Sequence, residues 1–484
     1  MNEIRLRDAL TPILNKFPMV ERPGWHVHFK TKLAWTAGIL ILFFALGNVP
    51  LFGLSPESMD LFGRWRAIFA GERFSLTALG IMPIVDASIV LQLLVGARII
   101  KLNLSDPKDQ AFYQNIQKLL VVVFAAFISL TYVVGFYKPD PGVAAMLGVS
   151  LQVISLMLFI QVFIGGMLIY FMDEVVSKWG IGSGVSLFII AGVSQQVITG
   201  LISPIRVEGW AVGVIPEWIQ IATEVPLYEI LAGGIIFLFQ HHMIALIATI
   251  AVFFTVVYLE STRVEIPLAH AIARGARGKF PIKLLYASVL PMILVRALQA
   301  SIQGFGRMLY SRGITIFGTY DEYGNAVSGL VYYLDPIYSP WDWVPGLMTI
   351  PHAGWQVATR LGVDLCFMVI GGAIFALFWI NTTGMGAKDV AAQIHRSGMQ
   401  IPGHRRSPAT IERLMEGYIP KIAIMGGAIL GILCVLSNMF GTLGQASGTG
   451  LLLAVSIAYR LYEDVASEQM MEMFPAMRRF FGGG

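Results

Sequence analysis

The sequence predicts an all-α membrane protein with ten transmembrane helices in two inverted five-helix halves. Composition gives the first indication, because 56% of the 484 residues are hydrophobic and only 13% are charged, whereas soluble globular proteins carry roughly 25% charged residues. A water-exposed surface of this composition would aggregate, so most of the chain is expected to face lipid. The spacing of apolar runs and the placement of Lys and Arg supply the remaining evidence.

The chain contains ten apolar runs of about 20 residues, the length that crosses a hydrocarbon core of about 30 Å. They occupy residues 33–49, 77–96, 118–137, 148–172, 184–202, 243–259, 284–302, 363–382, 422–440 and 448–465. Each run is predicted to form one transmembrane helix.

The loops on the two sides of the membrane carry unequal numbers of basic residues. Of the 34 lysines and arginines, 25 fall on the side that carries the N-terminus and eight on the other, while Arg296 lies inside a run. The positive-inside rule therefore predicts a multi-pass protein of the cell membrane with both termini in the cytoplasm. Five runs precede the middle of the chain and five follow it, so the second half starts from the opposite side of the membrane. This count is the basis for predicting an inverted repeat.

The predicted organisation has five parts. They are a cytoplasmic amphipathic segment (1–32), a first half (33–203), an external connection (204–242), a second half (243–465) and a cytoplasmic tail (466–484). The second half contains two long basic cytoplasmic loops, 260–283 and 383–421. Their arginines lie among Gly and Pro, which would expose guanidinium groups on turns to an anionic partner. Alternatively, the loops only fix the topology.

Residues 55–71 form an intermediate segment between the first two runs. The segment is too short and too polar to cross the bilayer, yet too apolar for a free loop. It is either an amphipathic helix on the surface or a short helix folded back into a cavity within the protein.

No sequence pattern indicates enzymatic chemistry or a bound cofactor. The chain lacks a phosphate-binding GxxxxGK[ST] loop, an HExxH zinc motif and a GxSxG nucleophile motif. Cys366 and Cys434 both lie in apolar runs and are predicted to be small core residues. His241 and His242 have no further ligand nearby in the sequence, so no metal site is predicted.

Six motifs, in order along nearly the whole chain, resemble the SecY family. They are QLLVG (92–96), QKLL (117–120), GIGSGVSLFIIAGVSQ (180–195), RVEIPLAH (263–270), GKFPIK (278–283) and GTGLLLAVSIAYRLYE (448–463). The RVEIPLAH motif is similar to the archaeal and eukaryotic branch of the family. Residues 204–242 and the tail after Glu463 are the least similar.

The resemblance implies a protein-conducting channel that passes unfolded secretory chains and releases apolar segments sideways into lipid. Such a channel has a central hourglass pore that is closed at its waist by an aliphatic ring and from outside by a re-entrant plug helix. By motif, the ring would be Ile81, Val85, Val185, Ile189, Ile293 and Leu453. The plug would be residues 55–71, including Ser55, Leu61, Phe62, Gly63, Ile68, Phe69 and Gly71.

The residue types of the implied ring suit such a waist. Branched aliphatic groups offer no hydrogen bond to a passing chain, and a narrow apolar constriction resists wetting. Spacing agrees independently, because Ile81 and Val85, like Val185 and Ile189, are four residues apart and share a helix face. Ordinary helix packing is the alternative explanation for each of these residues.

The resemblance also implies a lateral gate between the second and third spans on one side and the seventh and eighth on the other. Asp86 and Arg296 are unexpected charges on these helices. An intramembrane charge costs at least ~2.5 kcal/mol and needs a partner or water. We therefore hypothesise that Asp86 and Arg296 pair at the closed gate, with Ser301 and Gln303 adding polar contacts. In the alternative, each charge faces a wet vestibule alone.

Partners follow from the resemblance in the same way. The basic loops would dock a ribosome through Arg274, Arg277, Lys279, Arg405 and Arg406. A SecE/gamma-like subunit and a Sec-beta-like subunit would clamp the helices, while signal peptides, nascent chains and membrane lipid would meet the gate.

A secondary transporter for a small solute is the other possible function, because inverted halves and a midplane charge pair also fit it. The aliphatic waist favours the channel.

Overall fold

The structure of the protein is a computed structural model. It describes residues 19–25, 27–58, 66–96, 99–100, 102, 107–207, 209–270, 277–287, 289–321, 325–348, 352–396, 399–400, 407–444 and 446–473.

Every predicted span lies on a helix of the structure. In the first half these helices are α2 (Phe29–Gly47), α4 (Met82–Gly96), α5 (Pro107–Gly135), α7 (Leu151–Trp179) and α8 (Gly184–Ile202). In the second half they are α11 (Met243–Ser261), α12 (Leu290–Ser311), α14 (Gly354–Thr382), α16 (Pro408–Phe440) and α17 (Gly448–Met473).

Among the described residues, seven helices are long and apolar enough to cross a membrane by length and composition. The three remaining predicted spans are α4, α12 and α17. Helix α4 is apolar but has only 15 residues, α12 carries Arg296 and several amides, and α17 continues into a polar segment. These three helices contribute much of the buried centre of the molecule, where a continuous apolar surface toward lipid is not required.

Three predicted spans begin later than expected, and one of them, 148–172, does so by three residues, because α7 begins at Leu151. Residues 77–81 form turns before α4, and residues 284–287 form a turn before α12. The late start of α4 has a local cause. Gly80 has a φ of +53°, and a Cβ at this position would lie 2.0 Å from the carbonyl oxygen of Phe69. The Ile81 N–H donates to that same carbonyl at 2.8 Å, so the chain crosses the 66–69 segment closely before α4 can start.

Short helices lie between the long ones. They are α3 (Arg66–Phe69), α6 (Pro141–Leu147), α9 (Val214–Glu224), α10 (Leu227–Gln240), α13 (Gly329–Leu334), α15 (Ala387–Arg396) and a 3₁₀ helix at Pro340–Asp342. The predicted connection 204–242 therefore contains a helical hairpin, α9–α10. A small antiparallel sheet of β1 (Arg206–Val207) and β2 (Trp210–Ala211) precedes the hairpin.

The basic loops are not simple turns, which corrects the sequence prediction. β3 (Arg263–His270) and β4 (Arg277–Lys283) form an antiparallel hairpin, and β7 (Met399–Gln400) from the second loop pairs with β3. Ile266 and Ile282 are buried in an apolar cluster with Ile394 of α15 and Met415 of α16. Another two-stranded sheet joins β5 (Thr319–Tyr320) to β6 (Ala326–Ser328).

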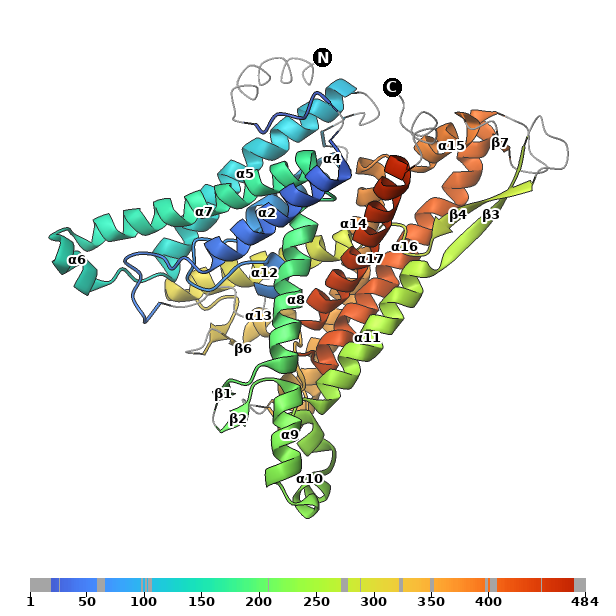
Figure 1. Ribbon diagram of the computed structural model, residues 1–484. Coiled ribbons are helices and arrows are strands. Elements are labelled where there is room, and N and C mark those ends of the chain that lie inside the picture. Colours follow the sequence, from blue (N-terminus) through green and yellow to red (C-terminus); the bar gives the residue numbers. More distant parts are fainter. Residues whose placement is uncertain are drawn as a thin grey trace.

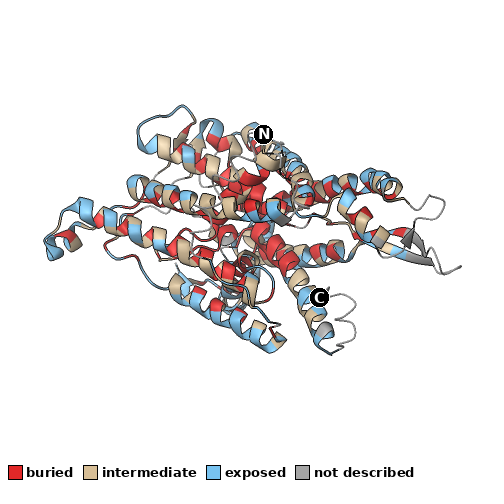
Figure 2. Ribbon diagram, turned by 90° about the horizontal axis from the view of Figure 1, so that it is seen from above, coloured by how far each residue is buried: buried red, intermediate tan, exposed pale blue. Residues whose placement is uncertain are grey.

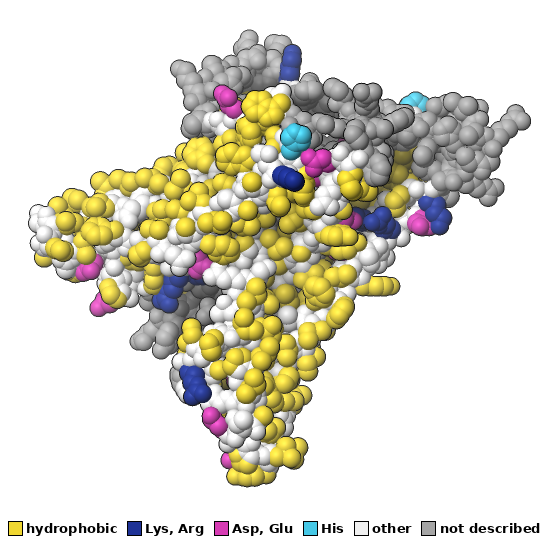
Figure 3. Space-filling view, viewed as in Figure 1, with side chains coloured by type: hydrophobic (Ala, Val, Ile, Leu, Met, Phe, Trp, Pro, Cys, Tyr) yellow, Lys and Arg dark blue, Asp and Glu magenta, His cyan; other side chains and the backbone are white. Residues whose placement is uncertain are grey.

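The two halves of the chain lie side by side, with both ends of the described chain at one end of the molecule (Figure 1). At that end, His28 Nδ1 lies 3.3 Å from Glu472 Oε1, and Lys32 donates to Glu468 at 2.6 Å. We call this the terminal end. Buried residues gather where the two halves meet, and the outer helices are largely exposed (Figure 2). Large apolar side chains cover the face shown in Figure 3, as expected of a surface that meets lipid.

Candidate functional site

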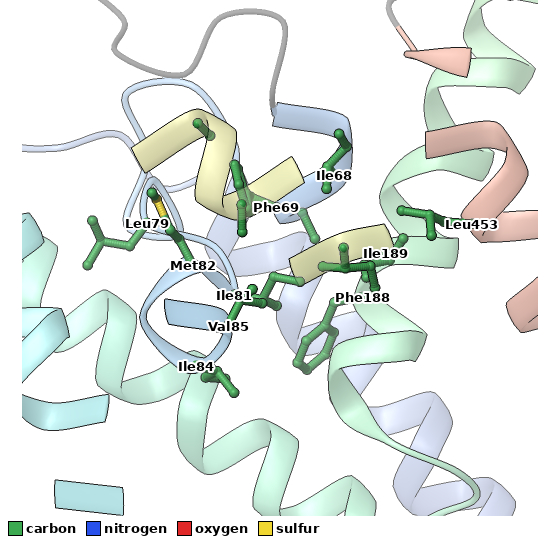
Figure 4. Close-up of a cluster of buried hydrophobic side chains, with 14 of the residues drawn as sticks. Ile68, Phe69, Leu79, Ile81, Met82, Ile84, Val85, Phe188, Ile189 and Leu453 are labelled. Atoms are coloured by element: carbon green, nitrogen blue, oxygen red, sulfur yellow. The ribbon is translucent and has the colours of Figure 1, made fainter. Parts of the chain in front are cut away.

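An aliphatic cluster occupies the meeting point of the two halves. Ile81, Val85, Ile189, Ile293 and Leu453 are each at most 4% exposed and belong to one core cluster, against which half-buried Val185 packs. Ile81 and Val85 lie beside Ile189 of α8, which in turn neighbours Leu453 of α17 (Figure 4). Five residues of the predicted ring, from the start of α4 and from α8, α12 and α17, therefore belong to the core that the two halves share, and Val185 packs against it.

Local hydrogen bonds fix the helix starts that position these side chains. The Val85 N–H donates to the Ile81 carbonyl at 3.1 Å, which places both residues on one face. The Val185 N–H donates to Asp173 Oδ1 at 2.9 Å, so the first turn of α8 is held against the end of α7. At the start of α17, the Thr449 N–H donates to Asn438 Oδ1 at 2.9 Å. The Asp173 and Asn438 side chains thus satisfy donors that the N-termini of α8 and α17 leave free.

The predicted plug segment lies beside the cluster. Ile68 and Phe69 of α3 are fully buried and join the same core, and they lie next to the ring side chains in Figure 4. Gly71 packs so closely that a Cβ there would lie 2.9 Å from the Ala78 carbonyl oxygen. Ser55, at the other end of the segment, donates its N–H to the Lys138 carbonyl at 2.9 Å. Leu61, Phe62 and Gly63 lie outside the described residues.

Within the described part of the predicted plug segment 55–71, the helix α3 is a single turn, Arg66–Phe69. Burial raises the pKa of the Glu72 carboxyl just after it, and the nearby Arg66 guanidinium partly opposes this rise. A partly buried carboxylate at the end of the segment destabilises its docked position, because burial disfavours the charged form.

Cavities lie on both sides of the aliphatic cluster. Toward the terminal end, a cavity of about 160 Å³ is lined by residues that include Ser183, the N-cap of α8, Ser186 of α8, and Arg460 and Asp464 of α17. Toward the opposite end, a cavity of about 1030 Å³ is lined by residues that include Arg66, Glu72, Gln195 and Thr199. On α8 itself, Ile189 lies between Leu187, which lines the first cavity, and Gln195, which lines the second, whereas position 185 falls among the residues that line the first cavity. Each of the two cavities therefore has polar as well as apolar residues in its lining.

The hypothesised pair of Asp86 with Arg296 is wrong. Arg296 is fully buried, and its Nη1 donates to Asp364 Oδ1 at 2.8 Å and to Gln299 Oε1 at 2.7 Å. Asp364, on α14, is also fully buried. The pair thus joins α12 to α14 and leaves α4 out.

Direction around the helix axis explains the error. Two charges on neighbouring helices pair only when both side chains point toward each other, and the direction of a side chain depends on its position around the helix axis. Ser301, five residues after Arg296, is the residue of α12 that reaches Asp86 of α4. Gln303 donates its Nε2 to the Val331 carbonyl in α13 at 2.7 Å, and it lines the same cavity as Asp86 and Ser301. Sequence reasoning missed Asp364, although an acid inside the apolar run 363–382 was a usable signal.

A side-chain hydrogen bond crosses the seam between α4 and α12. Ser301 Oγ donates to Asp86 Oδ1 at 3.3 Å, and Asp86 is 8% exposed. Mainly apolar cavities lie along the same seam. One of about 230 Å³ is lined by residues of α4, α5 and α12, including Phe127 and Leu298. Another, of about 800 Å³, is lined by residues of α4, α12 and α14, including Leu93 and Ile370.

The two basic loops come together through the pairing of β3 with β7, where Ala269 is opposite Gln400. Lys279 is 69% exposed on β4 and pairs with Glu265 of β3. At the base of the hairpin, Glu463 of α17 pairs with Lys283 and lies 3.6 Å from Arg263. Arg277 of β4 lies opposite Ala269 of β3 in the antiparallel backbone pairing. Arg274, Arg405 and Arg406 lie outside the described residues.

The histidine pair has a partner that the sequence did not reveal. Glu217, buried in α9, lies 2.9 Å from His241 Nδ1 and 3.3 Å from His242 Nδ1. Within the part of the chain that the structure describes, no group of three or more His, Cys, Asp or Glu side chains is arranged to hold a metal ion.

Comparison with known sequences agrees with these features. Residues 75–462 match the SecY family, and residues 41–73 match the plug domain of Sec61p. The protein translocase subunit SecY of Archaeoglobus fulgidus is 56% identical over 485 residues, with 98% of each chain covered. The same subunit of Methanocaldococcus jannaschii is 39% identical and covers 97% of this chain and 98% of its own.

Comparison with solved structures gives the same result. A structure of a protein conducting channel has a TM-score of 0.80 and 37% identity, covering 96% of this chain and 99% of that chain. Sec61 in the canine ribosome-channel complex has a TM-score of 0.77, also with 37% identity and with the same coverage. These matches favour the channel over the secondary transporter. Because the family match extends over residues 75–462, the chain belongs to the SecY family and is the central subunit of a protein translocation channel.

Proposed function

We propose that unfolded polypeptides cross the membrane through the ring of Ile81, Val85, Val185, Ile189, Ile293 and Leu453. One observation carries this proposal: separate elements of both halves contribute these aliphatic side chains to the buried core that they share, and Ile189 lies along α8 between the linings of two cavities. The segment that contains Ile68 and Phe69 rests on this cluster and closes it when no chain is present.

The chemistry of the ring suits its proposed task. Aliphatic groups form no hydrogen bond with any substrate side chain, so no sequence is retained. When the substrate leaves, the same groups repack on one another and on the plug, and this apolar contact holds back water and ions. Polar residues that line both cavities, such as Ser183 and Gln195, would keep the spaces above and below the ring hydrated.

Ion leakage tests the seal. Ile189→Ser introduces a hydroxyl into the ring and is expected to increase the ion permeability of vesicles that contain the idle channel complex. Ile198→Ser is the matched control, because Ile198 lies on the same helix but is 55% exposed on its outer face. Dissipation of a potassium gradient measures the leak. Equal permeability of the two variants would contradict a sealing role for the ring.

Apolar segments of a substrate are proposed to leave sideways between α4 and α12. The Ser301–Asp86 hydrogen bond, at 3.3 Å, is proposed to hold the seam closed until an apolar segment separates the two helices. The Arg296–Asp364 pair holds α12 to α14, and the two helices are therefore expected to move together as one side of the gate. Apolar cavities on both sides of the seam suit the entry of an apolar helix.

We propose that the terminal end faces the cytoplasm and that the membrane is the cell membrane. The distribution of 25 of the 34 basic residues supports this orientation. The β3–β4–β7 sheet lies at the same end, since its base is tied to Glu463 of α17. Its exposed Lys279, together with the basic residues of both loops, is proposed to dock a ribosome, whose RNA supplies the opposite charge.

Small subunits complete the proposed assembly. By family resemblance, a SecE/gamma-like and a Sec-beta-like subunit bind the outside of the bundle, while signal peptides and nascent chains enter from the terminal end. The proposed passage involves no covalent chemistry, so a partner such as the translating ribosome supplies the driving force.

A further inference from the structure

The α9–α10 hairpin projects from the end of the molecule opposite the termini (Figure 1). Helix α10, Leu227–Gln240, has the sequence LYEILAGGIIFLFQ and contains one charged residue, Glu229. None of its residues is buried against the protein, and Leu231 is 72% exposed. A helix that is apolar on every side is stable only when an apolar medium or partner surrounds it.

We propose that this hairpin inserts into the bilayer leaflet at that end of the molecule and is held there by lipid acyl chains. Length limits how it can insert. Fourteen residues of helix extend about 21 Å at 1.5 Å per residue, which is too short to span a core of about 30 Å. The helix is also bent at Gly234, where φ is +54°. It therefore lies within one leaflet.

The position of α10 along the chain agrees with this placement. Helix α11 begins at Met243, three residues after α10 ends, and α8 ends at Ile202, shortly before the hairpin. The hairpin thus lies in the connection between the ends of two helices that are long and apolar enough to cross a membrane. Tyr228, 69% exposed at the start of α10, is a residue type enriched at the membrane–water interface.

The exposed apolar surface of the helix bundle continues onto the hairpin, which identifies lipid as the medium that surrounds α10. Exposed Ile202 at the end of α8 and exposed Ile247 near the start of α11 belong to the outer apolar surface of the bundle. Exposed Ile219 of α9 and Ile235 of α10 extend this surface onto the hairpin, and apolar side chains cover its tip in Figure 3. A protein partner would instead be expected to meet an apolar patch with a polar rim on one face.

Polar contacts hold the base of the hairpin in a fixed orientation. Buried Glu217 contacts both His241 and His242, and Trp218 Nε1 donates to the His241 carbonyl at 2.8 Å. These groups face inward, where Glu217, His241 and His242 also line the cavity of about 1030 Å³. With the polar residues satisfied inside, the apolar residues of α10 are left to point outward. Lipid insertion would therefore anchor the wall of this cavity.

Depth-resolved fluorescence quenching tests the proposal without requiring translocation, so its failure is distinguishable from failure of the channel mechanism. The complete channel complex, with Cys366→Ala and Cys434→Ala, carries one NBD label at Leu231→Cys or Ile235→Cys. It is reconstituted in phosphatidylcholine–phosphatidylglycerol vesicles with or without doxyl lipids. Ile198→Cys, in the outer surface of α8, is the positive control. Glu57→Cys, whose parent side chain is 78% exposed, is the aqueous control.

The proposal predicts blue-shifted emission at both hairpin positions and quenching by shallow doxyl lipids at least twofold stronger than at Glu57→Cys. Emission and quenching like those of the aqueous control would overturn it. A blue shift without lipid quenching that disappears when the complex is diluted among excess vesicles would also overturn it, because a second copy of the chain would then cover the hairpin.

Discussion

At the scale of single residues, the buried ion pair of Arg296 and Asp364 makes the clearest stability prediction. Both side chains are fully buried, with Nη1 and Oδ1 2.8 Å apart. Asp364→Asn leaves a buried guanidinium without its counter-charge, which costs about 3–5 kcal/mol. Thermal unfolding of the detergent-purified complex measures the loss.

Two comparisons make this prediction specific. Glu57→Gln, which breaks the exposed pair with Lys138, is expected to have little effect because solvent screens such pairs. The double variant Arg296→Met with Asp364→Leu should recover most of the stability, since an apolar pair of similar volume often replaces a buried ion pair without loss. A double variant as unstable as Asp364→Asn would contradict this account of the pair.

Ser301 is predicted to hold the seam between α4 and α12 closed. Ser301→Ala removes the hydroxyl that donates to buried Asp86, and an unsatisfied buried acceptor costs about 1–3 kcal/mol. The closed seam is destabilised by this amount, so secretory chains with weakened signal peptides should be translocated faster. A reconstituted translocation assay measures the rate.

The matched control is Ser155→Ala on α7. The hydroxyl oxygen of Ser155, like that of Ser301, lies within hydrogen-bond distance of the carbonyl four residues earlier, but Ser155 lies on an exposed face. If both variants translocate the weakened substrates at the parent rate, Ser301 does not hold the gate.

The sequence indicates which charged residues lie inside the membrane-spanning runs, but not which residues they pair with. Apolar context singled out Asp86 and Arg296, and the cost of an intramembrane charge predicted that Arg296 has a partner. The identity of the partner depends on the rotation of α12 against α4 and α14, which composition and depth do not determine. Asp364 is the residue that this reasoning lacked.

At the scale of elements, the β3–β4–β7 sheet makes a prediction about docking. Lys279→Glu reverses a charge that is 69% exposed on β4. The variant is expected to bind ribosomes more weakly, and the slope of log affinity against log salt concentration should become shallower by about one for each phosphate that the lysine no longer neutralises. Sedimentation of the complex with ribosomes at several salt concentrations measures both quantities.

Lys138→Glu is the control for charge reversal at an exposed lysine. Lys138 also pairs with a glutamate, Glu57, and is 62% exposed, but it lies beside the plug segment, away from the basic sheet. Ribosome binding that falls equally in both variants would contradict docking through the sheet.

The sequence predicts the helices that coincide with long apolar runs, but not the strands and the helical hairpin, whose patterns are short. Runs of about 20 apolar residues predicted all ten long helices, because lipid demands continuous apolar surface. The sheet was missed, although Val264, Ile266 and Leu268 alternate along the 263–270 strand, because Gly and Pro nearby suggested turns. The α9–α10 hairpin was missed because the apolar run of α10 is too short to be recognised as a span.

At the scale of the whole molecule, the arrangement of the two halves explains why one subunit can both conduct and seal. Elements from both halves contribute to the aliphatic cluster, and separating the halves would open the ring and the α4–α12 seam together. The sequence predicted the ten spans and their division into halves from counting alone. The positions of the two cavities could not be predicted, because they depend on how side chains fill the space between helices.

Crosslinking tests the central claim most directly, namely that the translocating chain passes through the ring. A secretory chain stalled during translocation carries a single cysteine in its extended portion, and the channel carries Ile189→Cys or, as control, Ile198→Cys in the background of Cys366→Ala and Cys434→Ala. The account predicts disulfide crosslinks at Ile189→Cys and none at Ile198→Cys, which faces outward on the same helix. Crosslinks at Ile198→Cys without crosslinks at Ile189→Cys would place the substrate outside the ring and contradict the account.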